Sequence, residues 1–191
     1  MYPPTLAVIA LLCSLVLPVA AHIPEPPMRM LMDFDDTPQP VRWIAVNDGV
    51  MGGLSSGGPT VAGGRLVFTG VLSLANNGGF SSVRSSGRGF DLTDASHVVL
   101  RVLGDGRSYQ LRLATDARYR GSYVSYGAEF ATTAGEWIEV RVPLASLRPS
   151  VRGNLLQGPP FDASNVREIG LLIGDKREGP FALSVDWIAV E

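Results

Sequence analysis

The chain has 191 residues, of which 46% are hydrophobic and 18% are charged, and its formal net charge is -2. This length is enough for one domain with a hydrophobic core, and the weak charge argues against a nucleic-acid partner. One cysteine and two histidines are too few for a typical zinc centre, and 22 glycines and 14 prolines favour short strands with tight turns.

The amino terminus has the features of a secretory signal peptide. Residues 6–17 are apolar apart from Ser14. A membrane-spanning helix needs about 20 residues, so this run is too short to cross a bilayer comfortably. Small residues at 19–21 suit cleavage after about Ala21. We therefore expect a signal peptide over 1–21, a disordered proline-rich leader over 22–30 and one domain over 31–191.

Two compartments follow from two possible starts of translation. Cleavage of the signal peptide would place the protein in the periplasm or outside the cell, without a stable membrane span. Translation from Met28, Met30 or Met32 would remove the signal and leave a cytoplasmic protein. Export is the preferred interpretation, because the apolar run, the break at Pro18 and the small residues occur together.

Segments of β-branched and large apolar residues, each followed by turn residues, extend through the rest of the chain. Alternation is clear where Tyr109, Leu111 and Leu113 share one face and Gln110 and Arg112 share the other. We expect strands at 31–34, 42–46, 65–69, 71–74, 80–84, 97–103, 109–114, 122–130, 137–142, 169–173 and 181–190.

The sequence also predicts loops, turns and bulges between and within these strands. Gly70 is interpreted as a bulge or bend, and a phase slip near Asp186 predicts a β-bulge in the last strand. Residues 57–64 are expected to form a loop. Glycine and charged residues predict hairpin turns at 104–107 and 175–178.

Helix is limited to a turn or two near 144–147 and 162–168. The number of strands and the lack of helical crossovers predict an all-β fold, an antiparallel β-sandwich with jelly-roll topology. No internal repeat and no second domain are visible in the sequence.

The loop at 46–55, VNDGVMGGLS, is the first candidate binding rim. Asn47, Asp48 and Gly49 are turn residues, and two further glycines allow backbone to approach a neighbour closely. The apolar pair Val50 and Met51 is expected to tuck back onto the body of the domain. The alternative is a packed loop that only joins two strands.

No catalytic constellation is visible. The serines at 81, 82, 85 and 86 lack a neighbouring base, His97 is interpreted as structural, and a glycosidase acid pair has no support. Pairing of the first and last strands would bring four carboxylates together as calcium ligands, and solvated acids are the alternative. These four are Asp33, Asp35, Asp36 and Asp186. No metal or other cofactor is assigned.

A second candidate surface consists of outward-facing planar and aromatic groups. Gln110, Arg112, Tyr126 and Trp137 would stack on sugars or anchor a protein partner, unless a loop covers them. Arg84 follows a glycine-rich turn and is expected to pair with Asp48 or with a partner's carboxylate.

Five segments occur in an order that resembles the complex I intermediate-associated protein 30 family, over residues 32–191. They are VNDGVMGGLS, NNGGFSSVR, GDGRSYQLRL, EWIEVRVPL and IGLLIGDKREGPFALSVDWI. The matching positions are Asn47, Asp48, Gly49, Met51, Gly52, Gly53, Ser55, Gly78, Gly79, Phe80, Ser82, Arg84, Gly104, Asp105, Gly106, Tyr109, Trp137, Arg152 and Gly153.

The resemblance implies a galactose-binding-like jelly roll and an assembly factor for respiratory complex I without enzymatic activity. Our leading hypothesis is a binding module with an assembly or chaperone-like role, whose partner is a protein such as a respiratory complex subunit. The second hypothesis is an exported carbohydrate-binding module that takes a glycan. A polysaccharide-active enzyme is a third. Expected export disagrees with the family role, because the hydrophilic arm of bacterial complex I faces the cytoplasm.

Overall fold

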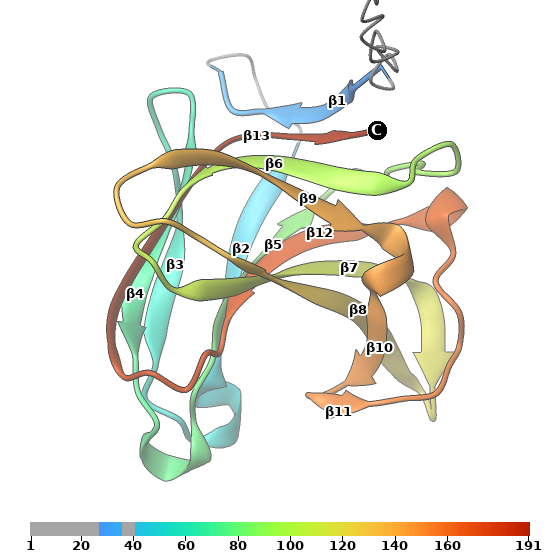
Figure 1. Cartoon of the computed structure of the whole chain (residues 1–191). Coiled ribbons are helices and arrows are strands. Elements are labelled where there is room, and N and C mark those ends of the chain that lie inside the picture. Colours follow the sequence, from blue (N-terminus) through green and yellow to red (C-terminus); the bar gives the residue numbers. More distant parts are fainter. Residues whose placement is uncertain (1–26, 36–40) are drawn as a thin grey trace, which may run out of the picture.

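A computed structural model of the chain describes residues 27–35 and 41–191. The expected signal peptide lies outside these residues, as does most of the expected leader. Two antiparallel sheets form a sandwich (Figure 1). The prediction of an all-β jelly-roll sandwich is confirmed.

The first sheet carries the chain's last strand at its centre. β13 pairs with three strands, which are β1, β4 and β6. Along the sheet the strands are β3 (Ser56–Val61), β4 (Leu66–Leu72), β13 (Gly179–Val190), β6 (His97–Leu103) and β9 (Trp137–Pro143), with β1 (Arg29–Asp33) beside β13.

The second sheet has seven strands and carries the candidate site. In order they are β11 (Asn154–Leu155), β10 (Arg148–Val151), β8 (Ser122–Ala131), β7 (Ser108–Tyr119), β12 (Glu168–Ile173), β5 (Ser81–Ser86) and β2 (Arg42–Asn47). Within residues 27–35 and 41–191, helix is confined to 3₁₀ turns at η1 (Asp48–Met51), η2 (Ala75–Asn77), η3 (Leu144–Ser146) and η4 (Ala163–Asn165). Two of these turns, η3 and η4, lie where the sequence predicted short helical segments.

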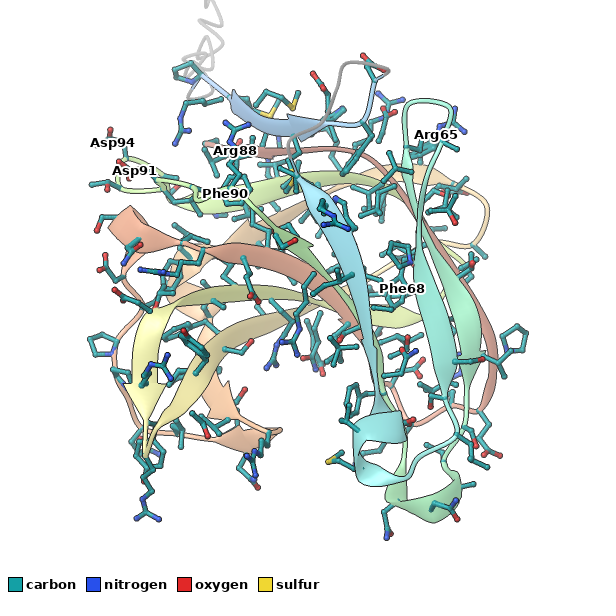
Figure 2. All side chains as sticks on the ribbon, turned by 180° about the vertical axis from the view of Figure 1, so that it is seen from behind. Arg65, Phe68, Arg88, Phe90, Asp91 and Asp94 are labelled. Atoms are coloured by element: carbon teal, nitrogen blue, oxygen red, sulfur yellow. The ribbon has the colours of Figure 1, made fainter. Side chains whose placement is uncertain are left out.

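Alternating side chains of both sheets fill the space between them. Tyr109, Leu111 and Leu113 of β7 are fully buried, as their spacing predicted. Phe68 points inward from β4 (Figure 2), and its ring centre lies 6.5 Å from that of Tyr109 and 4.9 Å from that of Phe181. The edge-to-face contact between Phe68 and Tyr109 joins the two sheets, and the one between Phe68 and Phe181 links neighbouring strands of the first sheet.

Residues 57–64 are not the expected loop, because most of them belong to β3, which pairs with β4 without interruption. β3 is an edge strand, where Pro59 can be accommodated. Gly70 is not a bulge either, since the register passes through it on both sides. A Cβ atom at Gly70 would lie 2.0 Å from the carbonyl oxygen of Ser56, so the position needs glycine because two strands and Phe181 crowd it.

The slip expected in the last strand is confirmed. The register of β13 against β6 shifts between Val185 and Trp187, as a β-bulge requires.

The turns at 104–107 and 175–178 are not hairpins. The first joins β6 to β7 and the second joins β12 to β13, and each pair belongs to different sheets. Both segments therefore carry the chain from one sheet to the other. The short strands β10 and β11 were not predicted, because Pro149 and three polar residues hide them in the sequence.

A buried ion pair links these two crossings. The guanidinium of Arg107 donates to both carboxylate oxygens of Asp175, from Nη2 at 2.6 Å and from Nε at 3.0 Å. Only 6% and 8% of the two side chains are exposed. The hydrogen bond to Asp175 raises the pKa of Arg107. Burial raises the pKa of Asp175, but the hydrogen bond from Arg107 outweighs it, so the net pKa of Asp175 is lowered.

Candidate functional site

A groove of about 1460 Å³ runs over the face of the second sheet that points away from the core. Strands β5, β12, β7, β8 and β10 supply its floor, and the η1 turn and the β10–β11 turn supply its two rims. Figure 1 shows the elements of the two rims, with β11 on one side and the turn after β2 on the other.

Three arginines lie in one line across the groove floor. Arg84 is opposite Gly170, Gly170 is opposite Arg112, Arg112 is opposite Gly127, and Gly127 is opposite Arg148. Residues directly opposite each other in antiparallel strands project to the same face of the sheet. We call Arg84, Arg112 and Arg148 the arginine row.

The two glycines leave space for the arginine side chains. A Cβ atom at Gly127 would lie 2.7 Å from Nη1 of Arg112, and one at Gly170 would lie 3.4 Å from Cγ of Arg84. The Arg112 side chain therefore occupies the space above Gly127. A larger residue at Gly127 would displace Arg112, whereas a Cβ atom at Gly170 would first meet the carbonyl oxygen of Val83 at 2.9 Å.

Arg112 is fixed in place by neutral partners. Its Nε donates to Oγ of Ser125 at 3.0 Å, its Nη1 to Oε1 of Gln110 at 3.1 Å, and its Nη2 to Oγ of Ser150 at 2.9 Å. Burial, together with the charge of Arg84, lowers the pKa of Arg112. An arginine still carries its charge at neutral pH, so the groove floor holds a partly desolvated cation.

The groove is cationic although the whole chain is slightly acidic. Arginines outnumber carboxylates by five to two among the residues that line it. The arginines are Arg84, Arg112, Arg148, Arg152 and Arg167, and the carboxylates are Glu129 and Glu168. The total charge of the chain is -2, so the positive charge is a property of this surface.

The loop at 46–55 is organised by one buried carboxylate, Asp48, which has no exposed surface. Its Oδ1 accepts from the backbone N–H of Ser55 at 2.9 Å, and its Oδ2 accepts from Oγ of Ser55 at 2.6 Å. Oδ2 also accepts from the backbone N–H groups of Gly79 at 2.7 Å and Phe80 at 3.3 Å. Asp48 thus joins the loop after β2 to the turn before β5. Its expected pairing with Arg84 is wrong.

Burial raises the pKa of Asp48, but hydrogen bonds from Ser55, Gly79 and Phe80 to the ionised form outweigh it, and the pKa falls below 3.8. The glycine of the loop that packs on this carboxylate is Gly53, where a Cβ atom would lie 2.3 Å from Cγ of Asp48. Asp48 and Gly53 thus hold in place the backbone of this loop and of the turn before β5.

The apolar pair of the loop is exposed rather than tucked inward. Val50 is 76% exposed and Met51 is 59% exposed, and both line the groove. The prediction that they turn back onto the body is wrong, because Asp48 takes the buried position of η1.

The structure brings only part of the predicted site together. The predicted residues that line the groove are Met51, Gly79, Phe80, Arg84, Gln110, Arg112 and Arg152. Those that support the loop behind the rim are Asn47, Asp48, Gly52, Gly53 and Ser55. Asn47, for example, donates from Nδ2 to the carbonyl oxygen of Gly57 at 3.0 Å.

Two predicted aromatic residues lie elsewhere. Tyr126 is fully buried, because it shares the phase of Val124 along β8 and packs into the core. Its ring centre lies 5.2 Å from that of Phe161. Trp137 belongs to β9 of the other sheet, with Arg65 over its ring. The expected face that joins both aromatics to Gln110 is therefore wrong.

Sequence reasoning missed several groove residues. They are Tyr123, Ser125, Gly127, Arg148, Ser150, Leu155 and Gly170. The only local signal was the alternation of Tyr123, Ser125 and Gly127 against buried Val124. Arg148 and Gly170 gave none, because their place in the row depends on the register between strands that are distant in sequence.

The serines and histidine that could suggest catalysis are engaged in structural contacts. Ser81 donates from Oγ to Oδ1 of Asn47 at 2.7 Å. Ser85 accepts at Oγ from the N–H of Ile169 at 2.8 Å. His97 contacts Ser96 through Nδ1 at 2.8 Å.

Among the candidate calcium ligands that the structure describes, Asp33, Asp35 and Asp186 do not form a group that could hold a metal ion. The first and last strands do pair, with Asp33 opposite Trp187, but Asp186 forms an ion pair with Arg101 at 3.3 Å. Asp36 lies outside the described part of the chain. Within that part, no three His, Cys, Asp or Glu side chains are grouped so that they could hold a metal ion, and no helix is long and apolar enough to span a membrane.

Comparison with known proteins gives a family match over most of the chain. The model of the complex I intermediate-associated protein 30 family matches residues 32–185. The mitochondrial complex I intermediate-associated protein 30 of Mus musculus is 30% identical over 105 residues, or 53% of this chain and 32% of the mouse protein. The match thus spans about a third of that relative's length.

Solved structures of low sequence identity share the fold. The family 11 carbohydrate-binding module of a cellulosomal cellulase of Clostridium thermocellum superposes with a TM-score of 0.61 at 14% identity, covering 86% of this chain and 94% of the module. The same kind of module in complex with a β-1,3-1,4-mixed-linked tetrasaccharide gives a TM-score of 0.60 at 14% identity, covering 85% and 94%. At 14% sequence identity these matches show that the fold is shared.

Proposed function

We propose that this chain, which belongs to the complex I intermediate-associated protein 30 family, is a non-enzymatic binding module. It would hold a protein partner in its groove during assembly of a respiratory complex. The family supplies the assembly role. The groove is the surface on which the partner would lie.

The observation that carries this proposal is the set of exposed apolar side chains at the groove rims. Val50 and Met51 on one rim are 76% and 59% exposed, and Leu155 on the other rim is 74% exposed. Tyr123, which also lines the groove, is 57% exposed. Clustered exposed apolar side chains mark surfaces that another protein covers.

The size of the groove supports a polymeric ligand. Pockets for small molecules measure roughly 300 to 1000 Å³, and the groove exceeds that range at about 1460 Å³. A segment of a protein partner would fill such a volume and cover both rims together.

The test uses the tagged full-length chain expressed in cells of its source organism, with the loop at 46–55 present. Chemical crosslinking and affinity purification should recover respiratory complex subunits with the wild type. The double variant Val50→Ser, Met51→Ser should recover several-fold less, because it removes apolar rim surface. Val71→Ser, at a site that is also 50% exposed but lies on the other sheet, is the matched control.

Two results would contradict the proposal. One is a wild type that recovers no protein partner. The other is a rim variant that recovers the same partners as the Val71→Ser control, since the groove would then have no part in the contact.

Export of the protein stays a prediction. Mass spectrometry of the mature amino terminus tests it, because cleavage after about Ala21 supports the periplasmic or secreted location. A chain that begins at Met28, Met30 or Met32 would overturn it. A chain that begins at Met30 or Met32 would also lack Arg29 of β1, which is opposite Val190 of β13.

A carbohydrate-binding module is the second candidate function. Tyr123 favours it, because it lines the groove and is an exposed ring on which a sugar could stack. Titration with a mixed-linked β-glucan tetrasaccharide tests it, and Tyr123→Ala should weaken the affinity. Because Trp137 lies on the other sheet, Trp137→Ala serves as the control. Absence of wild-type binding would end this candidate.

A further inference from the structure

We propose that the groove accepts an extended, acidic polypeptide segment whose carboxylates pair with the arginine row and whose apolar side chains cover the rims. This inference rests on the proposed function and adds to it the chemistry of the partner.

The positive charges of the arginine row have no partner carboxylate among the described residues. Within 27–35 and 41–191, no carboxylate lies within ion-pair distance of Arg84, Arg112 or Arg148. Arg167, by contrast, pairs with Asp116 at 3.8 Å. Arg84 and Arg148 are exposed, so their guanidinium groups can donate to a ligand. A guanidinium fork matches a carboxylate with two parallel hydrogen bonds.

The side chain of Arg112, at the centre of the row, is already held in one position before a ligand binds. Three hydrogen bonds to Gln110, Ser125 and Ser150 hold Arg112 between its two neighbours. A side chain that is already fixed loses little conformational entropy when a ligand binds. The neutral partners leave the charge of Arg112 uncompensated, so an anion above it gains attraction in a partly desolvated site.

The length of the arginine row matches that of a short extended polypeptide. The row crosses from β5 to β10 over four strand spacings, which is about 19 Å at 4.8 Å per spacing. An extended polypeptide rises about 3.3 Å per residue, so about six residues would cover the row. Every second side chain of an extended segment points the same way, so acidic residues in its middle can face the floor. Apolar residues at its two ends would then lie at the rims at Met51 and Leu155.

The apolar rims distinguish a polypeptide from an acidic polysaccharide. A uronate polymer carries carboxylates but has no aliphatic side chains to cover Val50, Met51 and Leu155, each of which is more than half exposed. A neutral glucan would leave the arginine row without a counter-charge. The combination of cationic floor and apolar rim favours a protein segment.

The experiment measures fluorescence anisotropy of a labelled ten-residue peptide that carries three glutamates and three valines, titrated with the full-length protein. The wild type should bind it. Arg84→Gln and Arg148→Gln should each weaken binding about fivefold, as expected for one solvent-accessible ion pair. Arg65→Gln replaces an exposed arginine in the turn before β4, at the other sheet (Figure 2), and this matched control should bind as the wild type does.

Further arms decide between ligand classes. A peptide with glutamine in place of glutamate should bind at least tenfold more weakly, and polygalacturonate should compete poorly. The inference is overturned if the acidic peptide does not bind at about 1 mM, if its glutamine twin binds equally well, or if polygalacturonate binds more tightly than the peptide.

Failure of this inference is distinguishable from failure of the proposed function. If the double variant Val50→Ser, Met51→Ser loses its partners in cells while Arg84→Gln and Arg148→Gln keep theirs, the groove binds a protein without using the row. If none of these variants changes partner recovery, both proposals fall.

Discussion

Replacement of Asp48 by asparagine should destabilise the fold, because an amide cannot accept all the hydrogen bonds that this carboxylate accepts. If the amide nitrogen takes the place of Oδ2, it faces the N–H groups of Gly79 and Phe80. If it takes the place of Oδ1, it faces the N–H of Ser55. Either orientation leaves at least one buried donor without an acceptor.

The expected loss follows from that count. One unsatisfied buried N–H costs about 1 to 3 kcal/mol, and replacing charge-assisted bonds by neutral ones adds about 1 kcal/mol. We expect Asp48→Asn to lower the free energy of unfolding by about 3 kcal/mol, which corresponds to roughly 6 to 12 °C in Tm for a chain of this size. The matched control is Asp186→Asn, because Asp186 forms a solvent-accessible pair with Arg101 and should cost less than about 1 kcal/mol.

The difference between wild type and Asp48→Asn should also depend on pH. The fold lowers the pKa of Asp48 from its ordinary value of 3.8. Ionised Asp48 therefore contributes its full stabilisation above about pH 3.8. This contribution is lost as the pH falls through the lowered pKa. Urea unfolding followed by circular dichroism at pH 7 and at pH 3 measures the effect. A difference below about 0.5 kcal/mol at pH 7 would refute the argument, as would a difference that does not shrink toward acid.

Two further predictions concern packing and charge in the same fold. Gly53→Ala should lower the free energy of unfolding by about 1 to 3 kcal/mol, because its Cβ would meet Asp48 at 2.3 Å. Gly49→Ala, whose Cβ would meet nothing within 4 Å, should change it by less than about 0.5 kcal/mol, and equal effects would contradict the contact. Arg107→Ala should cost about 3 to 5 kcal/mol in urea unfolding by leaving Asp175 buried and unpaired. A double-mutant cycle with Asp175→Ala checks this, and additive losses would show that the pair is not coupled.

The positions of the strands could be predicted because they depend on local patterns. Alternation placed Tyr109 and Leu111 in the core and Gln110 and Arg112 on the other face of the same strand. The bulge near Asp186 was also predictable, since a phase slip is visible within one segment. The β3 strand was missed because glycine, proline and threonine there resemble a loop until a partner strand is present.

The candidate site could be predicted only in fragments. Motif positions such as Met51, Phe80 and Arg84 do line the groove, but Asp48 accepts hydrogen bonds from Ser55 and Gly79 and does not pair with Arg84. The sequence also assigned Tyr126 and Trp137 to a common outer face, although one is buried and the other belongs to the opposite sheet. Burial and sheet membership are properties of the assembled molecule, and local propensity does not contain them.

By itself, the sequence determined an all-β sandwich of short strands, because side-chain alternation and turn residues act over a few neighbouring positions. Only the tertiary structure decided that 104–107 and 175–178 cross between sheets rather than close hairpins. It also decided that Arg84, Arg112 and Arg148 stand in one row. The physical reason is that pairing and register between distant strands are set by the shared core, and the same turn chemistry is compatible with either connection.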